Sequence, residues 1–128
     1  MSEWKNVIIV EDDPIAALLT KKVLERDSAF GAYHHYPNGK AAVEGLNKFV
    51  KTTGEIPDLI LLDLNMPVMN GWQFLDTIGR DAALSRIPVI ILTSSIDPRD
   101  IARSQDYPSV LGYLSKPIKI KEVFNLLG

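Results

Sequence analysis

Four short apolar runs in this chain each end near a polar residue of a type that phosphoryl chemistry uses. The residues after the four runs are the acidic triplet Glu11-Asp12-Asp13, the single Asp63, the hydroxyl residue Thr93 and, after Ser115, the ammonium residue Lys116. Carboxylates are Mg²⁺ ligands, and a divalent cation together with an ammonium group can neutralise the oxygens of a phosphoryl group in transfer. If the fold brought these residues to one place, they would form a site for a metal ion and a phosphoryl group.

The four apolar runs are the segments that would bring these residues together. They cover residues 7–10, 59–62, 89–92 and 110–114 and consist mainly of Val, Ile and Leu. Apolar runs of this length with helical patterns between them are typical of buried strands in a parallel sheet. A weaker strand is expected at 32–36, where polar and aromatic residues mix as at a sheet edge. The carboxyl ends of parallel strands share one edge, and ligands bind outside it where the strand order reverses.

The segments between the strands carry apolar residues at helical spacing. Helices are predicted around 14–23, 43–50 and 71–79, from about 97, and at 120–127. In the first helix Pro14 suits the first turn, and Ile15, Leu18, Leu19 and Val23 would give it one apolar face. The alternation of strands and helices predicts an α/β layer fold with right-handed crossovers.

The bulk composition predicts a single domain over residues 1–128. This length suffices for a sizeable core, and a net charge of −2 argues against a broad surface for binding nucleic acid. Since no apolar run approaches the roughly 18 residues that a membrane helix needs, no membrane insertion is expected. The absence of cysteine excludes disulfides and thiolate metal sites. A cytoplasmic location is the resulting prediction.

The acidic triplet is the feature that separates this chain from most nucleotide-binding α/β proteins. Such proteins place glycines after the first strand, so that main-chain N–H groups can approach a phosphate. Glu11-Asp12-Asp13 contains no glycine and would repel a bare phosphate, unless a cation such as Mg²⁺ lay between them. Asp13 has an alternative role, because an acid at this place could simply cap the following helix.

The segment that begins at Asp63, the aspartate after the apolar run 59–62, resembles a motif of a known family. Asp63-Leu64-Asn65-Met66-Pro67-Val68-Met69-Asn70-Gly71 closely resembles the phosphoacceptor loop of response-regulator receiver domains. That loop has Asp, two variable residues, Met-Pro, one variable residue, Met, Asp or Asn, and Gly. Further matches, in the same order as in the family, are Asp12-Asp13, Thr93, Tyr113 and Lys116-Pro117. The resemblance covers about residues 5–127.

The resemblance implies a fold and a reaction. The fold would be a doubly wound, flavodoxin-like arrangement of five strand–helix units, with parallel strands in the order 2-1-3-4-5. Asp63 would accept a phosphoryl group from a sensor histidine kinase or a phosphotransfer protein. Mg²⁺ would be held by Asp12, Asp13, Asp63 and the main-chain carbonyl of Asn65, with Glu11 in a supporting role. The chain would be a switch that catalyses only its own phosphoryl transfer and dephosphorylation.

The resemblance also assigns the residues that would read the phosphoryl group. Lys116 would neutralise its oxygens, as a flexible point charge can. Thr93 would swing its hydroxyl toward it, and the small Ser94 would leave room. Tyr113 would then move inward, so that an unknown output protein would bind the face made by the helix from about 97, the strand 110–114 and the helix 120–127. Pro117 resembles the family's cis proline.

Several residues receive secondary assignments. Asn65 and Ser95 match the positions at which the family varies the access of hydrolytic water. His34 and His35, on the expected edge strand, are predicted to lie away from the site and to be surface residues with no metal role. The segment 106–113 lacks the acidic pair that one transcription-factor subfamily uses for dimer salt bridges, so DNA binding by that route is not expected.

Three other functions are compatible with parts of the pattern. A haloacid-dehalogenase-type phosphatase also uses an aspartyl phosphate, but it needs a second Asp where this chain has Asn65. A degenerate receiver would usually lose an acid or the lysine, and this chain keeps them. The chain could also be a fragment of a larger regulator.

Overall fold

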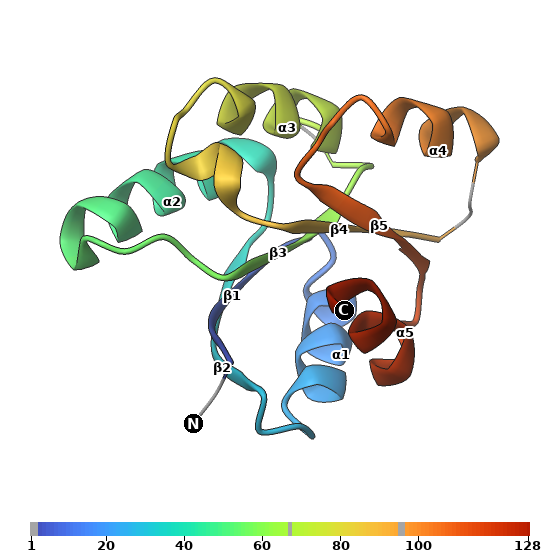
Figure 1. Cartoon of the computed structure of the whole chain (residues 1–128). Helices are drawn as coiled ribbons and strands as arrows, with labels where there is room; N and C mark the ends of the chain where they lie inside the picture. Colours follow the sequence, from blue (N-terminus) through green and yellow to red (C-terminus); the bar gives the residue numbers. More distant parts are fainter. Residues whose placement is uncertain (1–2, 67, 95–96) are drawn as a thin grey trace.

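The computed structural model describes residues 3–66, 68–94 and 97–128, in which strands and helices alternate along the chain (Figure 1). The strands are β1 (Trp4–Val10), β2 (Phe30–Tyr36), β3 (Leu59–Asp63), β4 (Val89–Thr93) and β5 (Val110–Ser115). The helices are α1 (Pro14–Leu24), α2 (Gly39–Thr53), α3 (Gly71–Gly79), α4 (Pro98–Ser104) and α5 (Ile120–Leu127), with a 3₁₀ turn η1 (Leu84–Arg86) before β4.

The five strands form one parallel sheet in the order β2-β1-β3-β4-β5. The predicted fold class and strand order are therefore confirmed, and β2 is an edge strand as expected. Helices α1 and α5 cover one face of the sheet, while α2, α3 and α4 cover the other (Figure 1). The strand order reverses between β1 and β3, which is where an α/β sheet of this kind binds its ligands.

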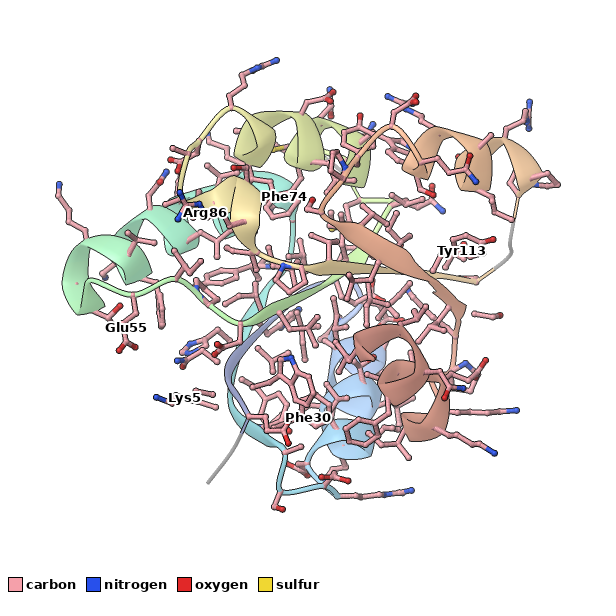
Figure 2. All side chains as sticks on the ribbon, in the orientation of Figure 1. Lys5, Phe30, Glu55, Phe74, Arg86 and Tyr113 are labelled. Atoms are coloured by element: carbon pink, nitrogen blue, oxygen red, sulfur yellow. The ribbon has the colours of Figure 1, made fainter. Side chains whose placement is uncertain are left out.

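The core lies on both faces of the sheet, which explains the uninterrupted apolar runs. Ile8 of β1 packs in the cluster beneath α2 and α3, and its neighbour Ile9 packs in the cluster beneath α1 and α5. Figure 2 shows the same division, with Phe74 among the side chains near α3 and Phe30 among those near α1 and α5. A strand covered on both faces needs apolar residues at every position rather than at alternate ones.

The apolar face predicted for α1 is wrong for three of its four residues, while the fourth, Val23, packs against the core as predicted. Ile15, Leu18 and Leu19 are 68%, 50% and 54% exposed, whereas Ala17 and Leu24 are buried on the sheet side. Helix α1 carries apolar residues on more than one side, so periodicity alone does not decide which side is buried. Ala17 and Leu24 face the sheet, and Ile15, Leu18 and Leu19 remain at the surface.

Helix α4 is short and reaches its neighbour α3 largely through aromatic contacts. The Arg103 guanidinium lies 4.6 Å from the centre of the Trp72 ring, and the Tyr107 ring stacks on Trp72 at 5.6 Å. The Tyr107 hydroxyl donates a hydrogen bond of 2.7 Å to Asp76 Oδ1. These contacts hold the end of α4 against α3, in a segment for which the sequence offers Ile101 as the main apolar anchor.

Candidate functional site

Three carboxylates from the ends of β1 and β3 converge at the carboxyl edge of the sheet. One oxygen each from Glu11, Asp12 and Asp63 lies within 4.8 Å of the others. They meet because β1 and β3 are adjacent and in register, with Val10 opposite Leu62. Glu11 and Asp63 are only 2% and 5% exposed, while Asp12 is open to solvent. Three carboxylate oxygens so placed can ligate a hard divalent cation.

The structure places Asp13 outside this cluster, although the sequence led us to expect it there. Its Oδ1 accepts a 2.9 Å hydrogen bond from the Ile15 N–H, so its carboxylate caps α1. Glu11, for which only a supporting role was expected, takes the place beside Asp12 and Asp63. An Asp directly before a proline at the first helical position is a typical N-cap, and this signal in the sequence favours the capping role.

Lys116, just beyond the end of β5, supplies the positive charge of the site. Its Nζ donates a hydrogen bond to Glu11 Oε1 and lies 3.4 Å from Asp63 Oδ2. Its main-chain N–H donates to the Thr93 carbonyl at 2.8 Å, which ties the ends of β4 and β5 together. The peptide bond between Lys116 and Pro117 is cis, as the family resemblance led us to expect. The ammonium group therefore lies between the two buried carboxylates.

Burial and mutual repulsion shift the ionisation of these groups. Burial, reinforced by a hydrogen bond with Asp63, raises the pKa of the Glu11 carboxyl to about 7. Burial opposes the charged form of Lys116, but its hydrogen bond to Glu11 and the charges of Asp63 and Glu11 outweigh this effect and raise the pKa of the amine. The cluster therefore holds three acids, Glu11, Asp12 and Asp63, against one ammonium group, and a bound cation would favour the ionised form of Glu11.

Two further predicted residues, Asn65 and Ser94, follow the ends of β3 and β4 in the described structure. The Asn65 N–H donates to Asp63 Oδ1 at 3.1 Å, so the loop after β3 begins by wrapping around the Asp63 carboxylate. Ser94 is exposed beside Thr93, where a small side chain leaves space. Ser95 and Pro67 lie outside the described residues.

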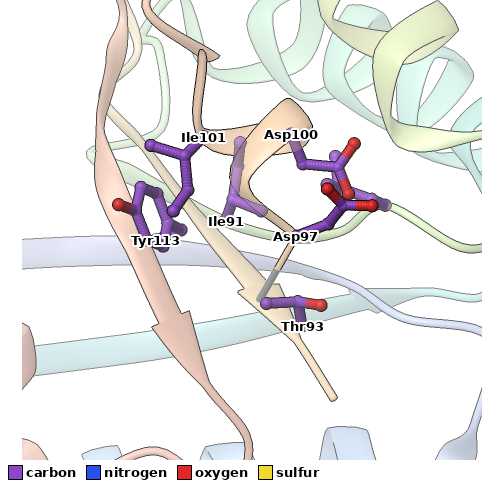
Figure 3. A pocket seen from close by; sticks show the side chains of 7 residues that line it. Ile91, Thr93, Asp97, Asp100, Ile101 and Tyr113 are labelled. Atoms are coloured by element: carbon purple, nitrogen blue, oxygen red, sulfur yellow. The ribbon is translucent and has the colours of Figure 1, made fainter. Parts of the chain in front are cut away.

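Thr93 and Tyr113 border one pocket beneath α4, shown in Figure 3. Thr93 ends β4 and is buried, and Tyr113 lies on β5 opposite Ile91 and is half-buried. The lining also includes Asp97, Asp100 and Ile101 of the α4 region. In Figure 3 the Thr93 side chain lies nearer the strand ends, and the Tyr113 ring lies on the opposite side of Ile91. Thr93, Tyr113 and residues of the α4 region therefore line one shared pocket.

The sequence profile of the response regulator receiver domain family matches residues 7–127. The chain belongs to this family. Receiver domains are signalling switches that accept phosphoryl groups from histidine kinases and act on output partners. This match confirms the resemblance that the loop after Asp63 indicated.

Individual relatives support the assignment. The response regulator Rcp1 of Synechocystis is 32% identical over 128 residues, a match covering 96% of this chain and 84% of Rcp1. The crystal structure of its Mn²⁺-bound form has a TM-score of 0.77 at 31% identity, covering 96% of this chain and 88% of that one. A two-component response regulator from Cytophaga hutchinsonii has a TM-score of 0.88 at 30% identity, covering 96% and 93%. The phosphorylated cyanobacterial phytochrome response regulator RcpA has a TM-score of 0.77 at 31% identity, covering 96% and 88%.

One histidine of this receiver domain lies closer to the site than expected. The His35 Nε2 is 2.7 Å from the main-chain oxygen of Glu11, whereas the His34 Nε2 is 3.2 Å from Asn6 Oδ1. The prediction that both histidines lie away from the site is therefore wrong for His35.

In the described parts of this receiver domain, no helix has the length and apolar character needed to cross a membrane.

Proposed function

We propose that this receiver domain is a switch that accepts a phosphoryl group on Asp63 from the phosphohistidine of a sensor histidine kinase or phosphotransfer protein. The observation that carries the proposal is the position of the Asp63 carboxylate, buried beside two other acids and within reach of Lys116. A carboxylate is a weak nucleophile toward a phosphoryl group, because both are negatively charged. Transfer therefore needs positive charge held in place, and the site is built to provide it.

Mg²⁺ is the cofactor that fits this site. The donors available are carboxylate oxygens from Glu11, Asp12 and Asp63, a set that suits a hard cation, and we add the main-chain carbonyl of Asn65 as a fourth donor. The presence of three acids beside a single lysine is a second reason for a cation to bind here. When bound, Mg²⁺ would supply the charge neutralisation that brings a phosphoryl group to Asp63.

Each protein group then has a distinct task. Asp63 offers the attacking oxygen, and Lys116, which now contacts both Glu11 and Asp63, would turn its ammonium group toward a phosphoryl oxygen. Its single charge on a flexible stem can follow the oxygen as the acyl phosphate forms. Thr93 would donate its hydroxyl to the same group at the end of β4.

The exposed apolar side of α1 is where we expect the phosphodonor protein to approach. Ile15, Leu18 and Leu19 form a contiguous apolar strip at the surface of the helix that begins directly after the acidic loop. A groove beside it is lined by Leu19 together with Lys116 and Pro117, and so leads to the site. Apolar surface of this kind, next to the reacting group, suits an apolar helical surface carrying the phosphohistidine.

The experiment that tests the proposed function uses a small phosphodonor. With acetyl phosphate and Mg²⁺ the intact mass of the chain should rise by one phosphoryl group, and with a chelator in place of Mg²⁺ it should not. An unchanged mass under both conditions would refute the proposal.

A cytoplasmic location and a single domain over residues 1–128 stay predictions.

The Mg²⁺ ligands can be distinguished by two neighbouring substitutions. We expect Asp12→Asn to weaken Mg²⁺ binding by about tenfold, or about 1.4 kcal/mol, since it removes a carboxylate from the cluster. Asp13→Asn removes the same charge one residue later and should leave the affinity nearly unchanged, because asparagine also caps helices well. Calorimetric titration measures both, and equal losses in the two variants would contradict the ligand assignment.

The output should be read on the face made by α4, β5 and α5. Thr93 and Tyr113 border the same pocket under α4, so a phosphoryl group that engages Thr93 would favour one arrangement of this region. Amide exchange compared between the unmodified and beryllofluoride-bound forms should change most in residues 93–116. Larger changes in α1 and in residues 32–50 would place the output face elsewhere.

A further inference from the structure

The main chain of Glu11 is held at both of its polar groups by β2. Strands β1 and β2 pair in register as far as Val10 and Tyr36. Beyond this pair the Glu11 N–H donates to the Tyr36 carbonyl at 3.0 Å. The Glu11 carbonyl oxygen lies 2.7 Å from His35 Nε2. A carbonyl can only accept, so this ring nitrogen carries the hydrogen.

A side chain is needed here because β2 stops providing main-chain donors. Pro37 follows Tyr36 and has no N–H. Asn38 then turns the chain into α2, whose N-terminus it caps by accepting from the Ala41 N–H at 2.8 Å. The His35 imidazole takes over where the ladder of main-chain hydrogen bonds between β1 and β2 ends.

The held carbonyl bears directly on two of the three clustered acids. The Glu11 carbonyl and the Asp12 N–H belong to one planar peptide group, so fixing one end fixes the plane. The rotation of that plane sets the directions in which the Glu11 and Asp12 side chains leave the main chain. Without the His35 hydrogen bond, this peptide group could rotate and spread the two carboxylates over more positions.

We propose that His35 is a positioning residue that raises the affinity of the carboxylate cluster for Mg²⁺ by holding the peptide group between Glu11 and Asp12. The inference rests on the proposed function, because it takes that cluster as the Mg²⁺ site. It deepens the proposal by adding a residue on β2 that supplies no ligand and acts only through its neighbours.

The test measures the rate of phosphorylation by acetyl phosphate against Mg²⁺ concentration, together with calorimetric Mg²⁺ binding and the melting temperature. In His35→Leu the half-saturating Mg²⁺ concentration should rise about threefold to tenfold, which is the effect expected from the loss of one hydrogen bond. The rate at saturating Mg²⁺ should stay close to that of the wild type, since the reacting groups are intact. His35→Gln, whose amide can donate from nearly the same place, should restore the wild-type half-saturation.

His34 offers a matched control on the same strand. It also bonds to a β1 residue through Nε2, but its partner is Asn6, far from the strand end. His34→Leu should lower the melting temperature about as much as His35→Leu without moving the half-saturating Mg²⁺ concentration. Equal shifts in the two Leu variants, or equal shifts in His35→Leu and His35→Gln, would overturn the positioning role.

The two proposals fail in different ways. If the wild-type chain binds Mg²⁺ but is not phosphorylated, the proposed function is refuted, and calorimetry of the His35 variants still decides the positioning role. If the wild type is phosphorylated and His35→Leu has the same half-saturating Mg²⁺ concentration, only the inference about His35 is overturned, and the proposed function stands.

Discussion

The Asp63→Asn variant should gain no phosphoryl group from acetyl phosphate and Mg²⁺, while the wild-type chain gains one. The amide that replaces the carboxylate offers no anionic oxygen to form an acyl phosphate. The loss of labelling should be complete rather than partial, because neither of the other two acids in the cluster is placed like Asp63, which is buried with an oxygen 3.4 Å from the Lys116 ammonium nitrogen. Asp12 is open to solvent, and Glu11 is already bonded to Lys116. Intact-mass analysis measures the labelling directly.

The controls for Asp63→Asn separate chemistry from folding. Asp63 contributes to the repulsion that raises the pKa of Glu11, so its neutralisation should not lower the melting temperature. Asp13→Asn, a change of the same charge at the cap of α1, should be labelled like the wild type. Undiminished labelling of Asp63→Asn would move the phosphoacceptor to another residue.

Replacing Lys116 with alanine should lower the rate of phosphorylation but raise the affinity for Mg²⁺. The rate of phosphorylation should fall by about 100-fold or more, as is typical when one preorganised electrostatic contact to a transition state is removed. Mg²⁺ should bind more tightly, because the cluster loses the ammonium group that now lies against Glu11 and Asp63. The rate with acetyl phosphate and a calorimetric Mg²⁺ titration test the two halves of the prediction.

The stability of Lys116→Ala gives a further check. Without Mg²⁺ the variant should melt at a lower temperature than the wild type, because two buried carboxylates lose their cation. Added Mg²⁺ should restore more stability to it than to the wild type. Lys119→Ala, three residues further along and exposed, should show none of these effects. A Lys116→Ala protein with normal phosphorylation would leave the lysine a purely structural role.

The sheet and its family could be read from the sequence because their signals are local. Strands β1, β3 and β4 are buried on both faces, so each is marked by an uninterrupted run of Val, Ile and Leu. The loop from Asp63 to Gly71 carries the family pattern within nine consecutive residues. Once the strands are assigned to a parallel sheet, the convergence of Asp63, Thr93 and Lys116 at one edge follows from geometry.

Only the tertiary structure decided which neighbouring residues face one another. The proline after Asp13 marks it as a helix cap, but nothing in the sequence indicates that Glu11 continues the pairing of β1 with β2 and joins the carboxylate cluster. The buried side of α1 depends on how the helix lies on the sheet, which buries Ala17 and Leu24 and leaves Leu18 and Leu19 exposed. His35 contacts Glu11 although the two residues are 24 positions apart in the sequence. Such contacts depend on where strands end and helices begin in space, and hydrophobic periodicity carries no information about them.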